Sequence, residues 1–189
     1  MTRFIIFIFI LAPLWITAGN TLNDPIPTIE GKIVFHKTYD SNLSELELND
    51  LIHQFLNEKL NPYSGIFTID NEDFTVCRIT DYILVESNFL QTFAMYMTYS
   101  LSVEYQSDGI QVHLQNIQFM EKEYFEAKEE AKTFRTRELN MPEYSGEDIM
   151  LHGYYKLLMV RKASQKVTQA ALQRINQIFE DIEILLLRH

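Results

Sequence analysis

The sequence predicts an α+β domain built on a largely antiparallel sheet. Three observations lead to this prediction: a strict apolar–polar alternation over residues 93–105, an amphipathic helical pattern over residues 44–60, and short turns between most of the strands. We expect the first helix to pack across one face of the sheet and a C-terminal helix to supply a second layer. The chain has 189 residues, of which 47% are hydrophobic, so a single domain with a sizeable core is expected.

The first strand and the first helix follow an extended leader at residues 20–29. Residues 31–39 (GKIVFHKTY) are rich in β-forming side chains and predict a strand. Ser44 and Glu47 form a capping box at the start of a helix. Apolar residues then recur at spacings of three and four, so they share one helical face that must be buried: Leu48, Leu51, Ile52, Phe55, Leu56 and Leu60. Asn61-Pro62 ends the helix, because the residue before proline avoids helical backbone angles.

The middle of the chain predicts a run of strands. Residues 65–71 and 74–85 are β-rich and flank a turn at 71–73, and the alternation over 93–105 indicates a strand with one buried face. Ser107-Asp108-Gly109 predicts a hairpin turn into a further strand. The apolar parity changes at Ile117, which indicates either a bulge near Gln115-Asn116 or the end of that strand.

The composition changes after Phe119. Residues 121–138 are highly charged and predict a solvated helix or a connector, and residues 145–148 (SGED) resemble a helix start. Apolar residues continue at helical spacing from Met150 to Leu185, with a polar interruption at 161–166 that fits one long helix or two shorter ones. We therefore assign residues 121–189 to a C-terminal helical extension, and expect its apolar stripe to dock at least partly on the sheet domain.

The first 19 residues have the features of a secretory signal peptide. Arg3 precedes an apolar run from Phe4 to Ile16, and small residues follow at 17–19. An uncleaved anchor is the alternative, but a membrane span needs about 20 apolar residues and this run is shorter and contains Pro13. The expectation is an exported protein, with cleavage near residue 19 and no stable membrane span afterwards.

Several sequence segments, in the order in which they occur, resemble a known family. They are GKIVFHKTY, the helix LSELELNDLIHQFLNEKL, the strand MYMTYSLSVEY, the Asp-Gly turn and GIQVHLQNIQF, within residues 31–120. Together they resemble an exported bacterial domain-of-unknown-function family with a TATA-box-binding-protein-like fold. The resemblance implies a curved antiparallel sheet backed by a helix, in a protein exported to the periplasm or cell surface of a bacterium. It implies no activity, because the family has none assigned.

Charge and cysteine content exclude several classes of function. The formal net charge of −10 argues against nucleic acid as a partner, because phosphates require basic side chains. The single cysteine, Cys77, excludes an internal disulfide and a multi-cysteine zinc site. The sequence contains no phosphate-binding loop and no nucleophile motif. We therefore predict no cofactor, no metal and no catalytic residue.

Three groups of side chains each have a possible chemical function and a simpler structural interpretation. His36 and His113 could meet on neighbouring strands and bind a metal, or be two half-exposed strand histidines. Cys77 could be a nucleophile, or a small buried apolar residue. The carboxylates at 45, 47 and 50 could act in acid–base chemistry, or complement the helix dipole. The simpler interpretation is favoured in each case.

The apolar stripe over residues 93–105 could line a ligand groove, but it is more typical of a buried core. The opposite side of that strand carries Tyr96. If only one face of the sheet is covered, that side is available to bind a ligand or partner.

Three hypotheses for the function remain open. The leading one is a non-enzymatic exported protein that binds a protein or peptide partner. The first alternative is an exported hydrolase whose site is assembled only in the fold. The second is an envelope structural protein that oligomerises through its C-terminal helix.

Overall fold

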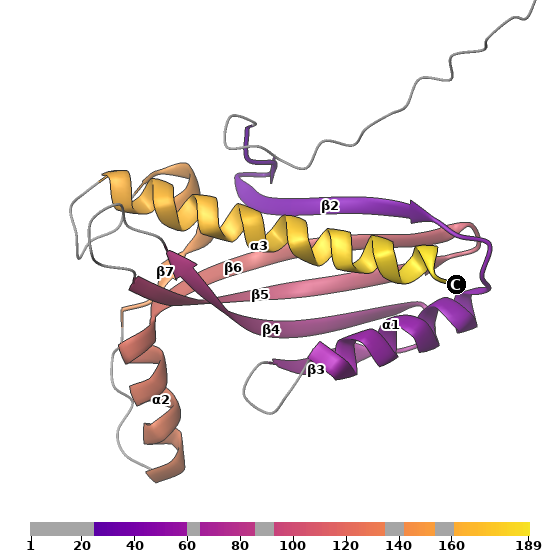
Figure 1. Cartoon of the computed structure of the whole chain (residues 1–189), viewed down its shortest axis with the longest axis horizontal. Helices are drawn as coiled ribbons and strands as arrows, with labels where there is room; N and C mark the ends of the chain where they lie inside the picture. The colour runs from indigo at the N-terminus through magenta and orange to yellow at the C-terminus, as the bar shows by residue number, and fades with distance from the viewer. Residues whose placement is uncertain (1–24, 60–64, 86–92, 135–141, 154–160) are drawn as a thin grey trace, which may run out of the picture.

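The computed structural model describes residues 25–59, 65–85, 93–134, 142–153 and 161–189 (Figure 1). Seven strands form one sheet in the order β1-β2-β6-β5-β4-β3, with β7 paired to β6, and every pairing is antiparallel. The strands are β1 (Thr28–Ile29), β2 (Lys32–Asp40), β3 (Gly65–Asp70), β4 (Phe74–Val85), β5 (Phe93–Gln106), β6 (Gly109–Glu121) and β7 (Tyr144–Ser145). The helical elements are α1 (Glu45–Lys59), α2 (Lys122–Phe134), the π-helix η1 (Glu147–Leu151) and α3 (Arg161–Leu187). The predicted α+β class with a mostly antiparallel sheet is confirmed.

Alternation along the central strands builds the core. The odd-numbered residues of β5 from Met95 to Tyr105 are all buried, and so are Ile110, Val112 and Leu114 of β6. The register pairs these residues with one another, since Leu101 faces Leu114 and Val103 faces Val112. One face of the sheet is therefore apolar and sealed, and the even-numbered side chains point to the other face.

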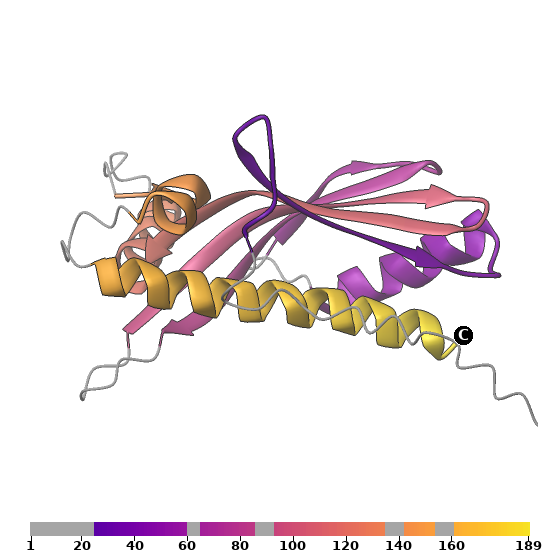
Figure 2. The same ribbon diagram turned by 90° about the horizontal axis from the view of Figure 1, so that it is seen from above.

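Both α1 and α3 lie on this apolar face (Figures 1 and 2). In α1 the most deeply buried side chains are Leu48, Ile52 and Leu56, while Leu51 and Phe55 are half-buried. The capping box is present, because the Glu47 carboxylate accepts from the Ser44 amide at 2.9 Å and the Ser44 hydroxyl accepts from the Glu47 amide at 3.4 Å. Helix and cap thus match the prediction, and the predicted members Leu60 and Pro62 lie outside the described residues.

The hairpin and the bulge of β6 also match the sequence pattern. Gly109 has a φ of 151°, and a Cβ there would lie 2.0 Å from the Tyr39 carbonyl oxygen, so only glycine fits between β5 and β2. Asn116 has a φ of 55° at the point where the β5–β6 register shifts. The extra residue is a β-bulge, and it returns Ile117 and Phe119 to the core face.

The C-terminal helix α3 is part of the same hydrophobic core. Its buried residues repeat at helical spacing and are Val167, Ala171, Leu172, Ile175, Ile178, Phe179 and Ile182. Polar contacts fix its position on the sheet, since Tyr39 donates to the Phe179 carbonyl at 2.7 Å and Lys37 pairs with Glu183 at 2.6 Å. The expected docking of this stripe is confirmed. The division at residue 120 into a domain and an extension stays a prediction, although described residues on both sides of it share one core.

Some elements differ from the sequence-based expectations or lie beyond them. The leader contains the two-residue strand β1, and β7 adds a second short strand before η1. The charged stretch forms α2 over residues 122–134, and the expected helix start near residue 145 leads into η1. The signal peptide at 1–19 and the junction at 154–160, which decides whether the C-terminal region is one helix or two, lie outside the described residues.

Candidate functional site

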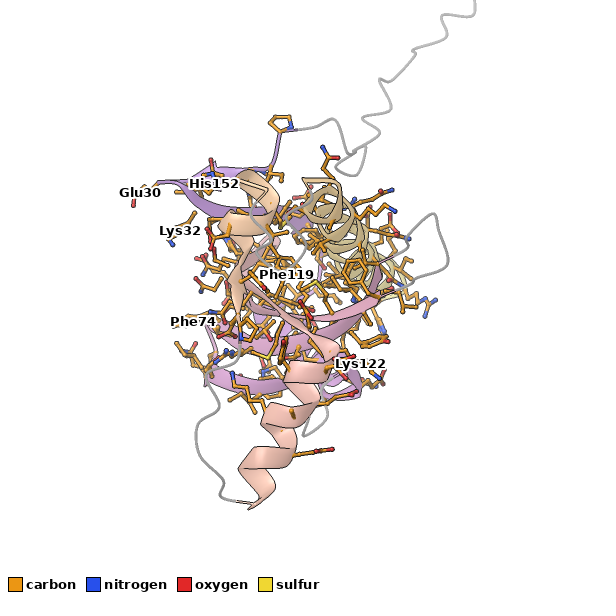
Figure 3. All side chains as sticks on the ribbon, turned by 90° about the vertical axis from the view of Figure 1, so that its left-hand side faces the viewer. Glu30, Lys32, Phe74, Phe119, Lys122 and His152 are labelled. Carbon is orange, nitrogen blue, oxygen red and sulfur yellow. The ribbon has the colours of Figure 1, made fainter. Side chains whose placement is uncertain are left out.

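The face of the sheet opposite α1 and α3 is the candidate site, and we call it the open face. It is formed by the even-numbered residues of β2, β4 and β5, together with Gln111, His113, Gln115, Gln118 and Met120 of β6. Figure 3 shows Phe74 on the side of the sheet away from α3. The helix α2 closes one end of this face, because Phe125 stacks on Tyr96 with ring centroids 4.0 Å apart.

The centre of the open face consists of short polar side chains in cross-strand rows. Thr80 and Thr98 share a hydrogen bond of 2.9 Å between their hydroxyls, and Ser102 lies opposite His113. These side chains are half-buried by their neighbours, although neither α1 nor α3 lies over them. Hydroxyl and amide groups in this setting are available to donate and accept hydrogen bonds.

A hollow of about 370 Å³ lies where the open face meets α2. Its floor includes Arg78, Thr80, Thr98 and Gln118, and Lys128 of α2 lines its wall. The guanidinium of Arg78 donates to the Gln118 side-chain oxygen at 3.4 Å, a long bond to a neutral group. Glu129 and Glu143 also line the hollow. Its size is in the range of a small ligand or one or two peptide side chains.

Apolar side chains are exposed along the β3–β4 edge of the open face. This apolar strip comprises Ile66, Ile69, Phe74, Tyr82 and Leu84, with exposed fractions between 36% and 60%. Ile66 lies directly opposite Arg78 and Ile69 opposite Val76, so the strip borders the polar centre. Exposed apolar side chains beside polar groups are typical of a surface that binds a partner.

His36 and His113 do meet, as the sequence suggested. They are paired across β2 and β6, and their rings stack with centroids 6.1 Å apart at an interplanar angle of 24°. The nitrogen lone pairs lie in the ring planes, so two stacked rings do not direct them at a common point. Within the described ranges, no group of three or more His, Cys, Asp or Glu residues could hold a metal ion. The geometry favours two strand histidines over a metal centre.

Cys77 is fully buried on the core face. Burial raises the pKa of its thiol to about 12, and the nearby Asp70 carboxylate acts in the same direction. A nucleophilic cysteine requires an accessible thiolate, which this environment opposes. The structure favours the interpretation of Cys77 as a small core residue.

The arrangement closest to a catalytic constellation joins α1 to the β3–β4 turn. His53 Nε2 lies 2.7 Å from Asp70 Oδ1 and 3.1 Å from Thr75 Oγ1, and Thr75 Oγ1 lies 3.0 Å from the Tyr105 hydroxyl. A nucleophile–base–carboxylate triad uses the two different nitrogens of its histidine, whereas one nitrogen makes both contacts here. Thr75 is also fully buried. These bonds hold α1 against the sheet edge.

The carboxylates at the start of α1 have a structural account. Glu45 and Glu47 lie in the first turn, where negative charge complements the helix dipole. The hydrogen bonds from the Ser44 hydroxyl and amide lower the pKa of Glu47. Asp50 lies exposed on the outer side of the helix. No shared function for the three follows from their positions.

Two solved structures of bacterial proteins are similar to this chain. A DUF4468 family protein from Bacteroides ovatus is 18% identical with a TM-score of 0.63, over 85% of this chain and 90% of its own. A TBP-like protein from Parabacteroides distasonis is 12% identical with a TM-score of 0.64, over 85% of this chain and 96% of its own. The predicted resemblance to a bacterial domain-of-unknown-function family with a TATA-box-binding-protein-like fold is confirmed at the level of the fold. Neither a scan against protein-family models nor a search of curated proteins gave a match.

The sequence pattern predicted Tyr96 on this face, whereas Arg78, Phe125 and Lys128 were not predicted there. Arg78 occupies an even position of a strand whose odd positions include Cys77, Ile79, Ile83 and Val85, which is the pattern of an outward side chain. Phe125 and Lys128 belong to a stretch whose charges indicated a solvated helix or a connector. The alternation along the strand predicts that Arg78 lies on the outer face. It does not predict that α2 lies beside Arg78.

Proposed function

We propose that the chain is a non-enzymatic exported binding protein, and that its open face binds a protein or peptide partner. The observation that carries the proposal is the asymmetry of the sheet: α1 and α3 seal one face, and the other presents hydroxyl, amide and imidazole groups beside an apolar strip. Proteins that bind partners commonly use such a surface, with apolar contacts for affinity and polar groups for orientation.

Export is supported by the sequence, through the signal-peptide features of residues 1–19. Among the described residues, no helix has both the length and the hydropathy that a bilayer span requires. The net charge of −10 disfavours a nucleic-acid partner despite the fold. A periplasmic or cell-surface location in a bacterium follows as part of the proposal.

Neither alternative has a specific observation in its favour. A hydrolase would need an accessible nucleophile, and the best candidate cluster has a buried Thr75 and a single histidine nitrogen for two contacts. Oligomerisation through the C-terminal helix would need a free apolar stripe, and that stripe is buried on the chain's own sheet, leaving Ile184 and Leu187 exposed near its end.

Affinity capture from the native bacterial envelope tests the proposal. The wild-type chain is compared with Ser102→Arg, which places a long cation in the centre of the open face, and with Gln173→Arg, which makes the same change on the exposed side of α3. We expect a specific partner that the wild type and Gln173→Arg retain and that Ser102→Arg loses. A partner retained by Ser102→Arg but lost by Gln173→Arg would place binding on α3 instead and refute the proposal.

A further inference from the structure

We propose that the hollow beside α2 is a saccharide-binding site that takes an uncharged sugar. The hollow lies at one end of the open face, where α2 follows β6 directly and turns away from the sheet (Figures 1 and 3). The site adds a second class of ligand to the protein or peptide partner proposed above. It does not depend on that partner, because only the residues that line the hollow are involved.

The first observation is the balance of charge. Among the described residues that line the hollow, Arg78 and Lys128 contribute two positive charges, and Glu129 and Glu143 contribute two negative charges. The lining is therefore formally neutral, and it gives no overall preference for an anion or a cation. This balance favours an uncharged ligand over a phosphate, an acidic side chain or a polyamine.

The second observation is the supply of hydrogen-bonding groups. Besides the four charged side chains, Thr80, Thr98 and Gln118 bring hydroxyl and amide groups to the lining. Guanidinium and ammonium groups only donate, carboxylates only accept, and hydroxyl and amide groups do both. A sugar has a hydroxyl on most of its ring carbons, each able to donate and accept, so one ring engages several of these groups together. A single uncharged peptide side chain brings one hydroxyl or one amide and engages fewer of them.

The floor of the hollow is already held in place by the sheet. Thr80, Thr98 and Gln118 form one cross-strand row on β4, β5 and β6, and the two threonine hydroxyls share a hydrogen bond of 2.9 Å. Arg78 precedes this row on β4 and donates to the Gln118 side-chain oxygen at 3.4 Å. Side chains that are fixed before the ligand arrives lose little conformational entropy when it binds, so a weakly interacting ligand such as a sugar benefits from this floor.

The third observation is an aromatic wall. Phe125 of α2 lines the hollow, and its ring stacks on Tyr96 with centroids 4.0 Å apart at an interplanar angle of 25°. Tyr96 in turn contacts Tyr82 edge-on, with centroids 5.4 Å apart, so the wall is supported from the sheet. One face of a sugar ring consists of C–H groups, and these pack against the negative face of an aromatic ring. The wall and the polar floor thus complement the two kinds of surface that a sugar presents.

The size of the hollow agrees with this class of ligand. Its volume of about 370 Å³ is at the small end of the range for ligand sites, which suits a mono- or disaccharide. An apolar ligand of the same size is disfavoured, because it would remove water from the charged and hydroxyl groups of the lining without replacing their hydrogen bonds.

A glycan array probed with the full mature chain tests the inference. The array carries uncharged, acidic and amino saccharides, and isothermal titration calorimetry then measures the affinity of the best uncharged binder. Arg78→Met removes the guanidinium, Thr98→Val removes a hydroxyl from the floor, and Phe125→Leu removes the aromatic wall. Thr38→Val and Phe74→Leu are the matched controls, because both residues lie on the open face in the row that joins Phe74, Glu104, Gln111 and Thr38, outside the lining. Thermal melts check that each variant is folded.

We expect an uncharged saccharide to bind. Arg78→Met should weaken its binding by about tenfold and Thr98→Val by about threefold, since each removes hydrogen bonds to the ligand. Phe125→Leu should weaken it by about threefold to tenfold. Thr38→Val and Phe74→Leu should leave the affinity unchanged.

Three results would overturn the inference: no saccharide binds, only charged saccharides bind, or the three hollow variants bind the uncharged saccharide as well as the wild type does. Each would leave the proposed function standing, because Ser102→Arg tests that function at a separate place on the open face. Loss of the captured envelope partner by Arg78→Met and Phe125→Leu, without any saccharide binding by the wild type, would assign the hollow to the protein interface instead.

Discussion

Arg174 on α3 donates from Nε to Asp81 Oδ2 on β4 at a distance of 2.8 Å, and this contact ties the last helix to the sheet. Tyr99 on β5 donates to the same carboxylate oxygen at 2.8 Å, so one side chain of β4 accepts from two elements. The Arg174 and Asp81 side chains are 25% and 16% exposed, which limits screening by solvent. Burial, together with the bond to Asp81, raises the pKa of Tyr99.

Removal of the guanidinium should destabilise the domain. Arg174→Met leaves the Asp81 carboxylate with one donor fewer in a partly buried site, and should lower the free energy of unfolding by about 1.5–3 kcal/mol. Urea denaturation measures this. The control is Lys37→Met, which breaks the more exposed pair with Glu183 and should cost at most about 1 kcal/mol. Equal losses in the two variants would show that the Asp81 site has no special role in docking α3.

Truncation after Lys166 should abolish cooperative folding. It removes Val167, Ala171, Ile175 and the later apolar residues of α3, and so exposes the core face of the sheet to water. Differential scanning calorimetry should show a broad or absent transition, and the truncated chain should lose solubility. A truncated chain that melts like the full one and loses only partner binding would instead identify α3 as an interaction arm.

Substitutions in α1 should follow the burial gradient of its apolar face. Ile52→Ala removes methyl groups from a site that is 1% exposed and should cost about 2–5 kcal/mol. Phe55→Ala should cost less than a fully buried phenylalanine, because Phe55 is half-buried. Leu46→Ala is the matched control, since Leu46 is 69% exposed and its loss should change stability by about 0.5 kcal/mol or less. An effect of Leu46→Ala as large as that of Ile52→Ala would mean that α1 is rotated on the sheet.

Stability should fall in alkaline solution. Burial raises the pKa of Cys77 to about 12, and burial also raises the pKa of Tyr105 to about 12. The unfolded chain loses these protons at the lower ordinary pKa values of about 8.5 and 10, while the folded chain keeps them. The stabilisation is therefore complete below about pH 8 and is lost as the pH rises toward 12. Urea melts across this range measure the decline, which should be smaller in Cys77→Ala.

The fold was largely predictable because the spacing of apolar residues along a strand or helix follows directly from which side chains are buried. The odd positions from Phe93 to Tyr105 had to share a face in any sheet. The change of parity at Ile117 indicated either a bulge near Gln115-Asn116 or the end of the strand, and the structure has the bulge. The capping box of Ser44 was equally local, because both partners lie within four residues. Such features depend on near neighbours in the chain.

The candidate site was less predictable because it depends on long-range placement. The even positions of β4 and β5 were recognisable as outward, but only the docking of α1 and α3 on the same face leaves these side chains uncovered. The approach of Lys128 to Arg78 depends on the angle at which α2 leaves β6, and Phe125 sets that approach by stacking on Tyr96. The spacing of residues within α2 does not determine the angle at which the helix leaves β6.

Site-specific photocrosslinking in the native bacterial envelope tests the use of the open face most directly. A benzophenone amino acid is placed at Ser102 or Thr38 on the open face, and at Gln54 of α1 or Gln173 of α3 on the exposed sides of the covering helices. The account predicts a discrete crosslinked partner from the open-face positions and none from the two helix positions. Adducts from Gln54 or Gln173, with none from Ser102 and Thr38, would contradict it.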